Sequence, residues 1–356
     1  MAVLVVVGAA GMAGFVGPTL AQDGTQGYEE AIEAGIEEGV QVAQQQGIEV
    51  TQEQIAAVRV GSEAAVTQQQ AVSAEQVQAA VAGTTAGIVI QEQTIEVIQV
   101  QAITEGTLTG TLQQAQTVEA SQLQEIAGST AANAATQAQT LSAEQLQAIC
   151  GGAGAGTTAA VAQRQDVSAE QIQVVAGSAV EGTAVQAQNV EASQLQAASS
   201  AAGYGALVQA QEISVEQLQA AIFGALEGGL AQAQTLSAEQ LQATILGGLD
   251  GVLQAQSVSA EQTQAIASSA AGSAGQTAAQ DGVTDTEKIR AAASGAGYGT
   301  ANGVATQAQQ VTAEQLQAVT GSSASGALQS QTATVSQVQT AATGAGYGGV
   351  QINFQQ

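Results

Sequence analysis

One motif of about 23 residues recurs along the chain, and this repeat restricts the fold more than any other feature. Its clearest copies read Leu-Ser-Ala-Glu-Gln-Leu-Gln and begin at Leu141 and Leu236, with close variants at Val167 and Val311. The first apolar residue of the motif, repeat position 0, recurs at 50, 72, 95, 118, 141, 167, 190, 213, 236, 258, 283, 311 and, in degenerate form, 333. Such a period indicates one supersecondary unit stacked many times.

Each unit opens like an α-helix. In the copy that starts at Leu236, Ser237 can cap the first turn and Gln240, three residues later, can complete a capping box. Apolar residues then follow in steps of four, as at Leu241, Ile245 and Leu249, which is helical spacing. Five hydroxyl residues at this point of the motif are predicted helix caps: Ser142, Ser168, Ser237, Ser259 and Thr312.

Repeat positions 11 and 15 are small in unit after unit. A glycine inside a helix costs about 1 kcal/mol relative to alanine, and small residues four apart let two helix backbones approach closely. We therefore expect Gly228→Ala to be nearly neutral and Gly228→Leu to be destabilising. The predicted helix-packing residues are Gly83, Gly87, Gly106, Gly110, Gly152, Gly156, Gly224, Gly228, Gly247 and Gly251.

The repeat predicts an all-α fold, an elongated array or solenoid of about thirteen antiparallel helices. A helix of about 18 residues is about 27 Å long, and the residues left in each unit suffice for a reversal of the chain. We assign 22–49 to an N-terminal capping segment, 50–345 to the array with an insertion near 281–300, and 346–356 to a C-terminal tail. A β-solenoid is the alternative, which explains the period but neither the caps nor the steps of four.

The composition removes most catalytic classes. The chain has no histidine and one cysteine, Cys150, so it cannot supply a Ser–His–Asp triad, a Cys/His zinc site or an internal disulfide. Four basic residues against 30 acidic ones give a net charge of −26, which disfavours nucleic acid as a partner. We predict no enzymatic activity, no cofactor and no metal site. The glutamates of the motif are interpreted as residues of the first helical turn, with weak cation binding along an edge as the alternative.

An acidic run and a Gly-Tyr-Gly motif are two further features of the sequence that suggest other roles. The run 281–287 contains three acidic residues but lacks the glycine and distal glutamate of an EF-hand loop, so we interpret Thr284 to Glu287 as another capping box. Gly-Tyr-Gly occurs around Tyr204, Tyr298 and Tyr347 and is interpreted as a variant of the helix-packing segment, or else as an aromatic contact point.

The N-terminus predicts export. Residues 2–16 form an almost unbroken apolar run, followed by a small-residue segment that ends at Ala21, which is typical of a signal peptide spanning 1–21. We expect a secreted or cell-surface protein with no membrane span in the mature chain. Cys150 is interpreted as a small buried apolar residue, with intermolecular crosslinking as the alternative.

The acidic excess with a single lysine, Lys288, is similar in composition to acidic, lysine-poor proteins of halophilic archaea, and this resemblance implies a surface adapted to salt. Together these features predict a non-catalytic, exported structural or surface repeat protein that self-assembles. The alternative is a helical scaffold that binds a peptide, a polymer or a surface along one face.

Overall fold

The fold is an all-α array. The computed structural model describes residues 26–69, 72–91, 95–164, 166–210, 213–255, 258–306, 311–330 and 332–354. Within these ranges the chain forms fourteen α-helices, three short 3-10 turns and no β-strand. This confirms the predicted fold class and excludes the β-solenoid. The predicted signal peptide, 1–21, lies outside the described residues.

The helices follow the repeat units along the chain. They are α1 (Gln26–Gln45), α2 (Gln52–Val66), α3 (Ala74–Val89), α4 (Val97–Gln113), α5 (Ala120–Gln137), α6 (Ala143–Gln163), α7 (Ala169–Val185), α8 (Ala192–Val208), α9 (Val215–Leu230), α10 (Ala238–Leu253), α11 (Ala260–Asp281), α12 (Thr286–Ala305), α13 (Ala313–Leu328) and α14 (Val335–Phe354). The 3-10 turns, Ala115–Thr117, Ala138–Thr140 and Ala233–Thr235, each lie just before the next helix cap.

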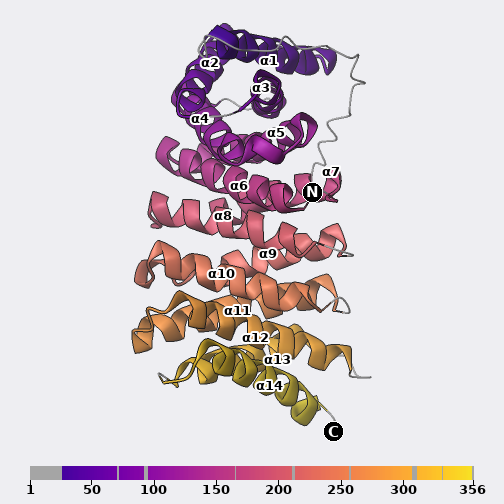
Figure 1. Cartoon of the computed structure of the whole chain (residues 1–356), viewed down its shortest axis with the longest axis vertical. Coiled ribbons are helices and arrows are strands. Elements are labelled where there is room, and N and C mark those ends of the chain that lie inside the picture. The colour runs from indigo at the N-terminus through magenta and orange to yellow at the C-terminus, as the bar shows by residue number, and fades with distance from the viewer. Residues whose placement is uncertain are drawn as a thin grey trace.

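The array has two layers. Each helix packs mainly against the helix two places further along the chain, and less extensively against its immediate neighbour. Gly83 of α3 meets Gln124 of α5, and Gly87 meets Gly128, so residue numbers rise together and these two helices are parallel. The odd-numbered helices therefore form one layer and the even-numbered helices the other, and Figure 1 shows them stacked in order from α1 to α14.

Consecutive helices lie in opposite layers and run in opposite directions. Gly248 of α10 faces Ala267 of α11, whereas Thr244, one turn earlier, lies next to Gly275, two turns later on α11. The predicted reversal at each unit is therefore present. The small residues, however, join parallel helices two units apart and not the successive antiparallel ones.

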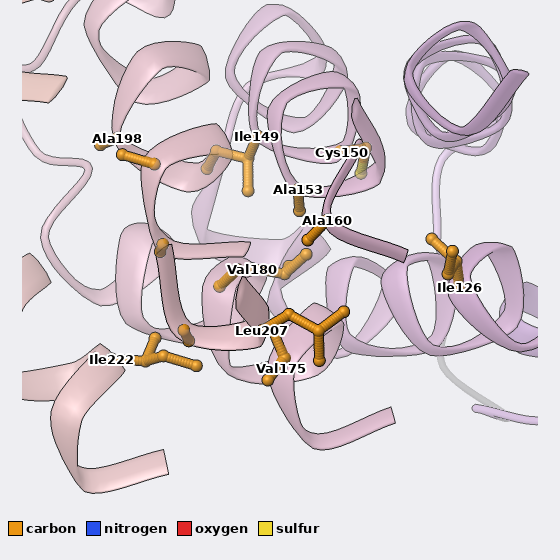
Figure 2. Close-up of a cluster of buried hydrophobic side chains, with 14 of the residues drawn as sticks. Ile126, Ile149, Cys150, Ala153, Ala160, Val175, Val180, Ala198, Leu207 and Ile222 are labelled. Carbon is orange, nitrogen blue, oxygen red and sulfur yellow. The ribbon is translucent and has the colours of Figure 1, made fainter. Parts of the chain in front are cut away.

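The core consists of small and aliphatic side chains. Figure 2 shows Ile126, Ile149, Val180, Leu207 and Ile222, which come from five successive helices and belong to one buried cluster. All of these side chains have no or almost no exposed surface. Because the helices approach so closely, this cluster is filled without a fully buried aromatic side chain among the described residues.

Three predicted boundaries need correction. The segment near 281–300 does not interrupt the array, because α12 packs between α10 and α14. Residues 346–354 are the end of α14 and not a tail, since Gly346 lies against Thr300 and Val350 against Gly303 of α12. The capping segment 22–49 contains α1, which stacks on α3 through Gly35 and Gly39 and so adds a fourteenth helix.

Candidate functional site

The ten predicted packing glycines all lie where two parallel helices touch. A methyl group on Gly247 would lie 2.6 Å from the carbonyl oxygen of Arg290, and at the other nine glycines it would lie closer still to a carbonyl oxygen of the helix two places on. Gly228 faces the carbonyl of Ser268 in this way. The expectation that Gly228→Ala is nearly neutral is therefore wrong, because the contact is with backbone that cannot rotate away.

The predicted caps lie at the starts of their helices. Ser142, Ser168, Ser237, Ser259 and Thr312 are N-cap residues whose hydroxyls accept from the backbone N–H three residues later, with the reciprocal glutamine bond in place. Because the layers run in opposite directions, Ser142 and Ser237 lie at one edge of the array and the other three at the opposite edge. The caps stabilise the individual helices and do not gather into one site.

The start of α12 differs from the prediction. Its N-cap is Asp285, whose carboxylate accepts from Lys288 N at 3.2 Å, and no reciprocal capping bond is present. The interpretation of Thr284 to Glu287 as a capping box is therefore wrong by one residue. The carboxylate of Asp285 makes the capping bond in place of the Thr284 hydroxyl, three residues after Gly282 ends α11 in the left-handed conformation with φ +65°.

A row of glutamines links the units, and sequence reasoning recognised only half of its role. The amide oxygen of Gln194 accepts from the N-cap nitrogen of Glu191, while its Nε2 donates to Ala233 O at 2.6 Å and Leu236 O at 2.8 Å. Those carbonyls belong to the turn two helices further on. The same donation is made by Gln76, Gln99, Gln145, Gln171, Gln217, Gln240 and Gln262.

The sequence does carry a signal for this link. A capping box admits glutamate as readily as glutamine, yet repeat position 4 is glutamine in every unit from 50 to 333 except the one that starts at 283. Only an amide can accept at one end and donate at the other. The absence of glutamate from repeat position 4 therefore indicates that the side chain there also donates a hydrogen bond to a second partner.

The acidic residues of the motif follow the helix starts along both edges. The pKa of Glu239 is lowered because its carboxylate accepts backbone and Ser237 hydrogen bonds in the first turn of α10. Within the described residues no group of three or more aspartate, glutamate or cysteine side chains is arranged to hold a metal ion. These glutamates are residues of the helix starts, as the motif predicted.

The four basic residues all pair within the chain. Arg59 binds Glu33 of α1, and Lys288 lies 4.0 Å from Asp285. Arg164 binds Asp166 and also donates to Leu207 O and Val208 O at the end of α8, at 3.3 and 3.2 Å.

The fourth basic residue completes a polar bridge across three helices of the even layer. Arg290 Nε of α12 donates to Asp250 Oδ2 of α10 at 2.8 Å, and Gln209 Nε2, next to the end of α8, lies 3.4 Å from Oδ1. Asp250 is buried, and this burial raises the pKa of its carboxyl group, while Arg290 opposes the shift.

Cys150 is buried in α6. Burial raises the pKa of its thiol to about 12, with a smaller opposing effect from Thr107. At neutral pH the residue is therefore a thiol and not a nucleophilic thiolate. Its surroundings fit the predicted role of a small apolar core residue.

In the Gly-Tyr-Gly segments, glycines pack against neighbouring helices while the tyrosine rings are partly exposed. Gly203 faces Thr157 of α6, and Gly205 faces Leu249 of α10, so the two glycines contact the preceding and the following helix of the layer. Tyr204 lies between them, partly exposed, and Tyr298 and Tyr347 are 37% and 42% exposed. Each tyrosine lies thirteen residues after the N-cap of an even-numbered helix, Glu191, Asp285 or Thr334. The three rings therefore share one face of the array.

The comparisons add no relationship. No protein-family model matches the sequence, and no curated protein matches it significantly. Among the described helices, none combines the length and the apolar character that a membrane crossing requires.

Proposed function

We propose that this chain is a non-catalytic structural protein, exported to the cell surface or beyond, that associates with copies of itself. The proposal is supported above all by one packing relation that recurs in both layers. In most same-layer pairs a glycine lies against the backbone of the helix two places on, and glutamine amides donate to the turn before that helix. The four basic residues are likewise paired with acidic residues of the same chain. A stiff rod with a repeated surface is suited to a structural role.

Two measurements test the proposal. Light scattering of the purified chain should show association at micromolar concentration. A protease added to intact cells should cleave the protein, because it lies outside the cell. A chain that remains monomeric at all concentrations and stays protected inside the cell would contradict it.

A second candidate function is binding of an uncharged polymer along the even layer. The face that carries Tyr204, Tyr298 and Tyr347 also carries the charge-paired Asp250 and Arg290 and the glutamines at repeat position 6, such as Gln196 and Gln339. Aromatic rings that stand between glycines offer flat stacking surfaces, and amides can exchange hydrogen bonds with hydroxyl groups.

Tyrosine fluorescence tests this candidate, because the chain has no tryptophan. Titration with a soluble neutral glucan should change the emission, and the double variant Tyr298→Ala/Tyr347→Ala should lose binding. Val185→Ala, which alters a 62% exposed residue of the other layer, serves as the control. Unchanged binding in the tyrosine variant would reject the tyrosine face as the binding surface.

A further inference from the structure

The outer side of α13 and α14, which we call the C-terminal end face, is an uncovered copy of the surface that joins the helices elsewhere. Gly326 of α13 and Gly344 and Gly348 of α14 occupy repeat positions 11 and 15. At these positions in earlier helices, glycines such as Gly228 touch the backbone of the helix two places on. At Gly326, Gly344 and Gly348 no atom of another described helix lies within 4 Å of where a methyl group would be.

The glutamine links stop at the same place. Gln315 Oε1 accepts from Thr312 N and Gln337 Oε1 from Thr334 N, both at 2.9 Å, as in the other capping boxes. Among the described residues, no turn carbonyl accepts from the amide nitrogens of these two glutamines. A shallow cleft of about 440 Å³ lies between α13 and α14 and is lined by Gly326, Ala327, Gln337, Val338 and Ala341, among others. Small residues, amide donors and a cleft thus coincide on one face.

The opposite end of the array is built differently. In α3 and α6, repeat position 9 is a buried residue, Val81 or Cys150, which lies in the core. Gly35 and Gly39 of α1 touch α3 as repeat positions 11 and 15 do elsewhere, which places Glu33 and Glu37 at positions 9 and 13. In α2 these positions are Arg59 and Glu63. Glu33 and Arg59 form an ion pair with both side chains about half exposed, and Glu37 and Glu63 are exposed. The N-terminal end face is therefore strongly polar.

Charge decides which partner suits the C-terminal end face. α14 contains no charged residue, and the only one in α13 is Glu314 in its first turn. Docking the N-terminal end of another copy here would bury Glu37 and Glu63 against a face that supplies no cation, which is costly. A second C-terminal end face brings no such charge, and small residues on both sides allow the backbones to approach.

We infer that two copies of this chain pack tail to tail through their C-terminal end faces and form a closed dimer. This inference rests on the proposed self-association and names the surface that performs it. The contact uses the small-residue surface that packs the helices inside each copy, now paired with the same surface of the second copy. It leaves the acidic N-terminal ends at the two extremes of a rod about twice as long as one molecule.

Light scattering and small-angle X-ray scattering of the purified full chain test the inference. We expect twice the mass of one chain, with a maximum dimension nearly doubled. The variant Gly344→Glu/Gly348→Glu should have the monomer mass at the same concentration. Its circular dichroism should be unchanged, because both added side chains start in open space. The control Val60→Glu adds a charge at a 47% exposed residue of α2 on the N-terminal end face and should remain dimeric.

The possible outcomes distinguish a failure of the assigned C-terminal end face from a failure of the proposed self-association. Assembly that persists in the double glutamate variant overturns the assigned face but leaves self-association intact. Dissociation by Val60→Glu with no effect of the double variant indicates a different contact and also overturns the inference. A wild-type chain that is monomeric under all conditions contradicts both this dimer and the proposed self-association.

Discussion

Gly151 and Gly152 of α6 are adjacent, but only a methyl group at Gly152 would overlap atoms of α8. Comparing the two positions therefore tests how closely the helices approach. A methyl group at Gly152 would overlap Gln196 O and Ser199 Oγ of α8, whereas at Gly151 the nearest atom is Gly106 O at 3.6 Å. We expect Gly152→Ala to destabilise the fold by about 1–3 kcal/mol through overpacking. Gly151→Ala should stabilise it by up to about 1 kcal/mol through helix propensity. Thermal unfolding of both variants checks this, and equal effects would contradict the close contact.

The glutamine link can be tested without disturbing the cap. In Gln76→Glu the carboxylate still accepts from Ser73 N but cannot donate to Ala115 O and Val118 O. Leaving these acceptors without a donor should cost about 1–3 kcal/mol in denaturant unfolding. Gln315→Glu retains the same capping geometry without a second described partner, so it should change stability little. A loss of similar size in both variants would assign the effect to the cap alone.

Cys150 should be inert in the folded protein. Its thiol is fully buried and its pKa is raised to about 12, so neither access nor thiolate is available at neutral pH. A thiol-specific chromogenic reagent should report no reaction in buffer and one thiol per chain in guanidinium chloride. Rapid reaction under native conditions would revive the crosslinking alternative.

At the scale of the helix, the sequence predicts where each helix begins but not which other helix it packs against. Ser142 and Thr312 could be predicted as caps because a cap is a contact over three residues. The phase of Gly83 and Gly87 indicates a packing face, but nothing local distinguishes the next helix from the one after it. That choice depends on how two layers fill space, and the methyl clearance at Gly228 depends on distances that no residue pattern records.

The C-terminal end of α11 allows backbone strain to be tested separately from side-chain packing. Gly282 has φ +65° and nothing within 4 Å of a methyl group, so a side chain there is strained only by its own backbone. Gly282→Ala should cost about 1–2 kcal/mol, and Gly282→Asn less, because asparagine visits this region more readily. Thermal unfolding measures both. A cost for asparagine equal to or above that of alanine would indicate an undetected contact.

At the scale of the whole molecule, acid should stabilise the fold over a limited range. The chain carries a net charge of −26, and burial raises the pKa of Glu125 and Asp250 in the folded state. A carboxyl group with a raised folded pKa binds protons more readily when folded, so stability rises as the pH falls from 7 towards the ordinary carboxyl values. Groups with a lowered pKa, such as Glu239, oppose this at lower pH, where their contribution is lost.

Melting temperatures measured from pH 7 down to about pH 4 check the sign of this effect. We expect an initial rise, a smaller rise in Asp250→Asn, and a further gain when salt screens the remaining acids. A melting temperature that falls steadily from pH 7 would show that paired carboxylates dominate the titration.

The opposed directions of the two layers give the array an approximate two-fold screw axis along its length. One step along the chain turns a helix over and carries it to the other layer with the same contacts, as Gly83 on Gln124 and Gly106 on Gln147 illustrate. Loss or gain of a single unit therefore preserves the packing but transfers every downstream surface residue to the opposite face. Tyr204, Tyr298 and Tyr347 share a face because an even number of units separates them. A one-sided surface on such a chain survives insertions and deletions only when units are gained or lost in pairs.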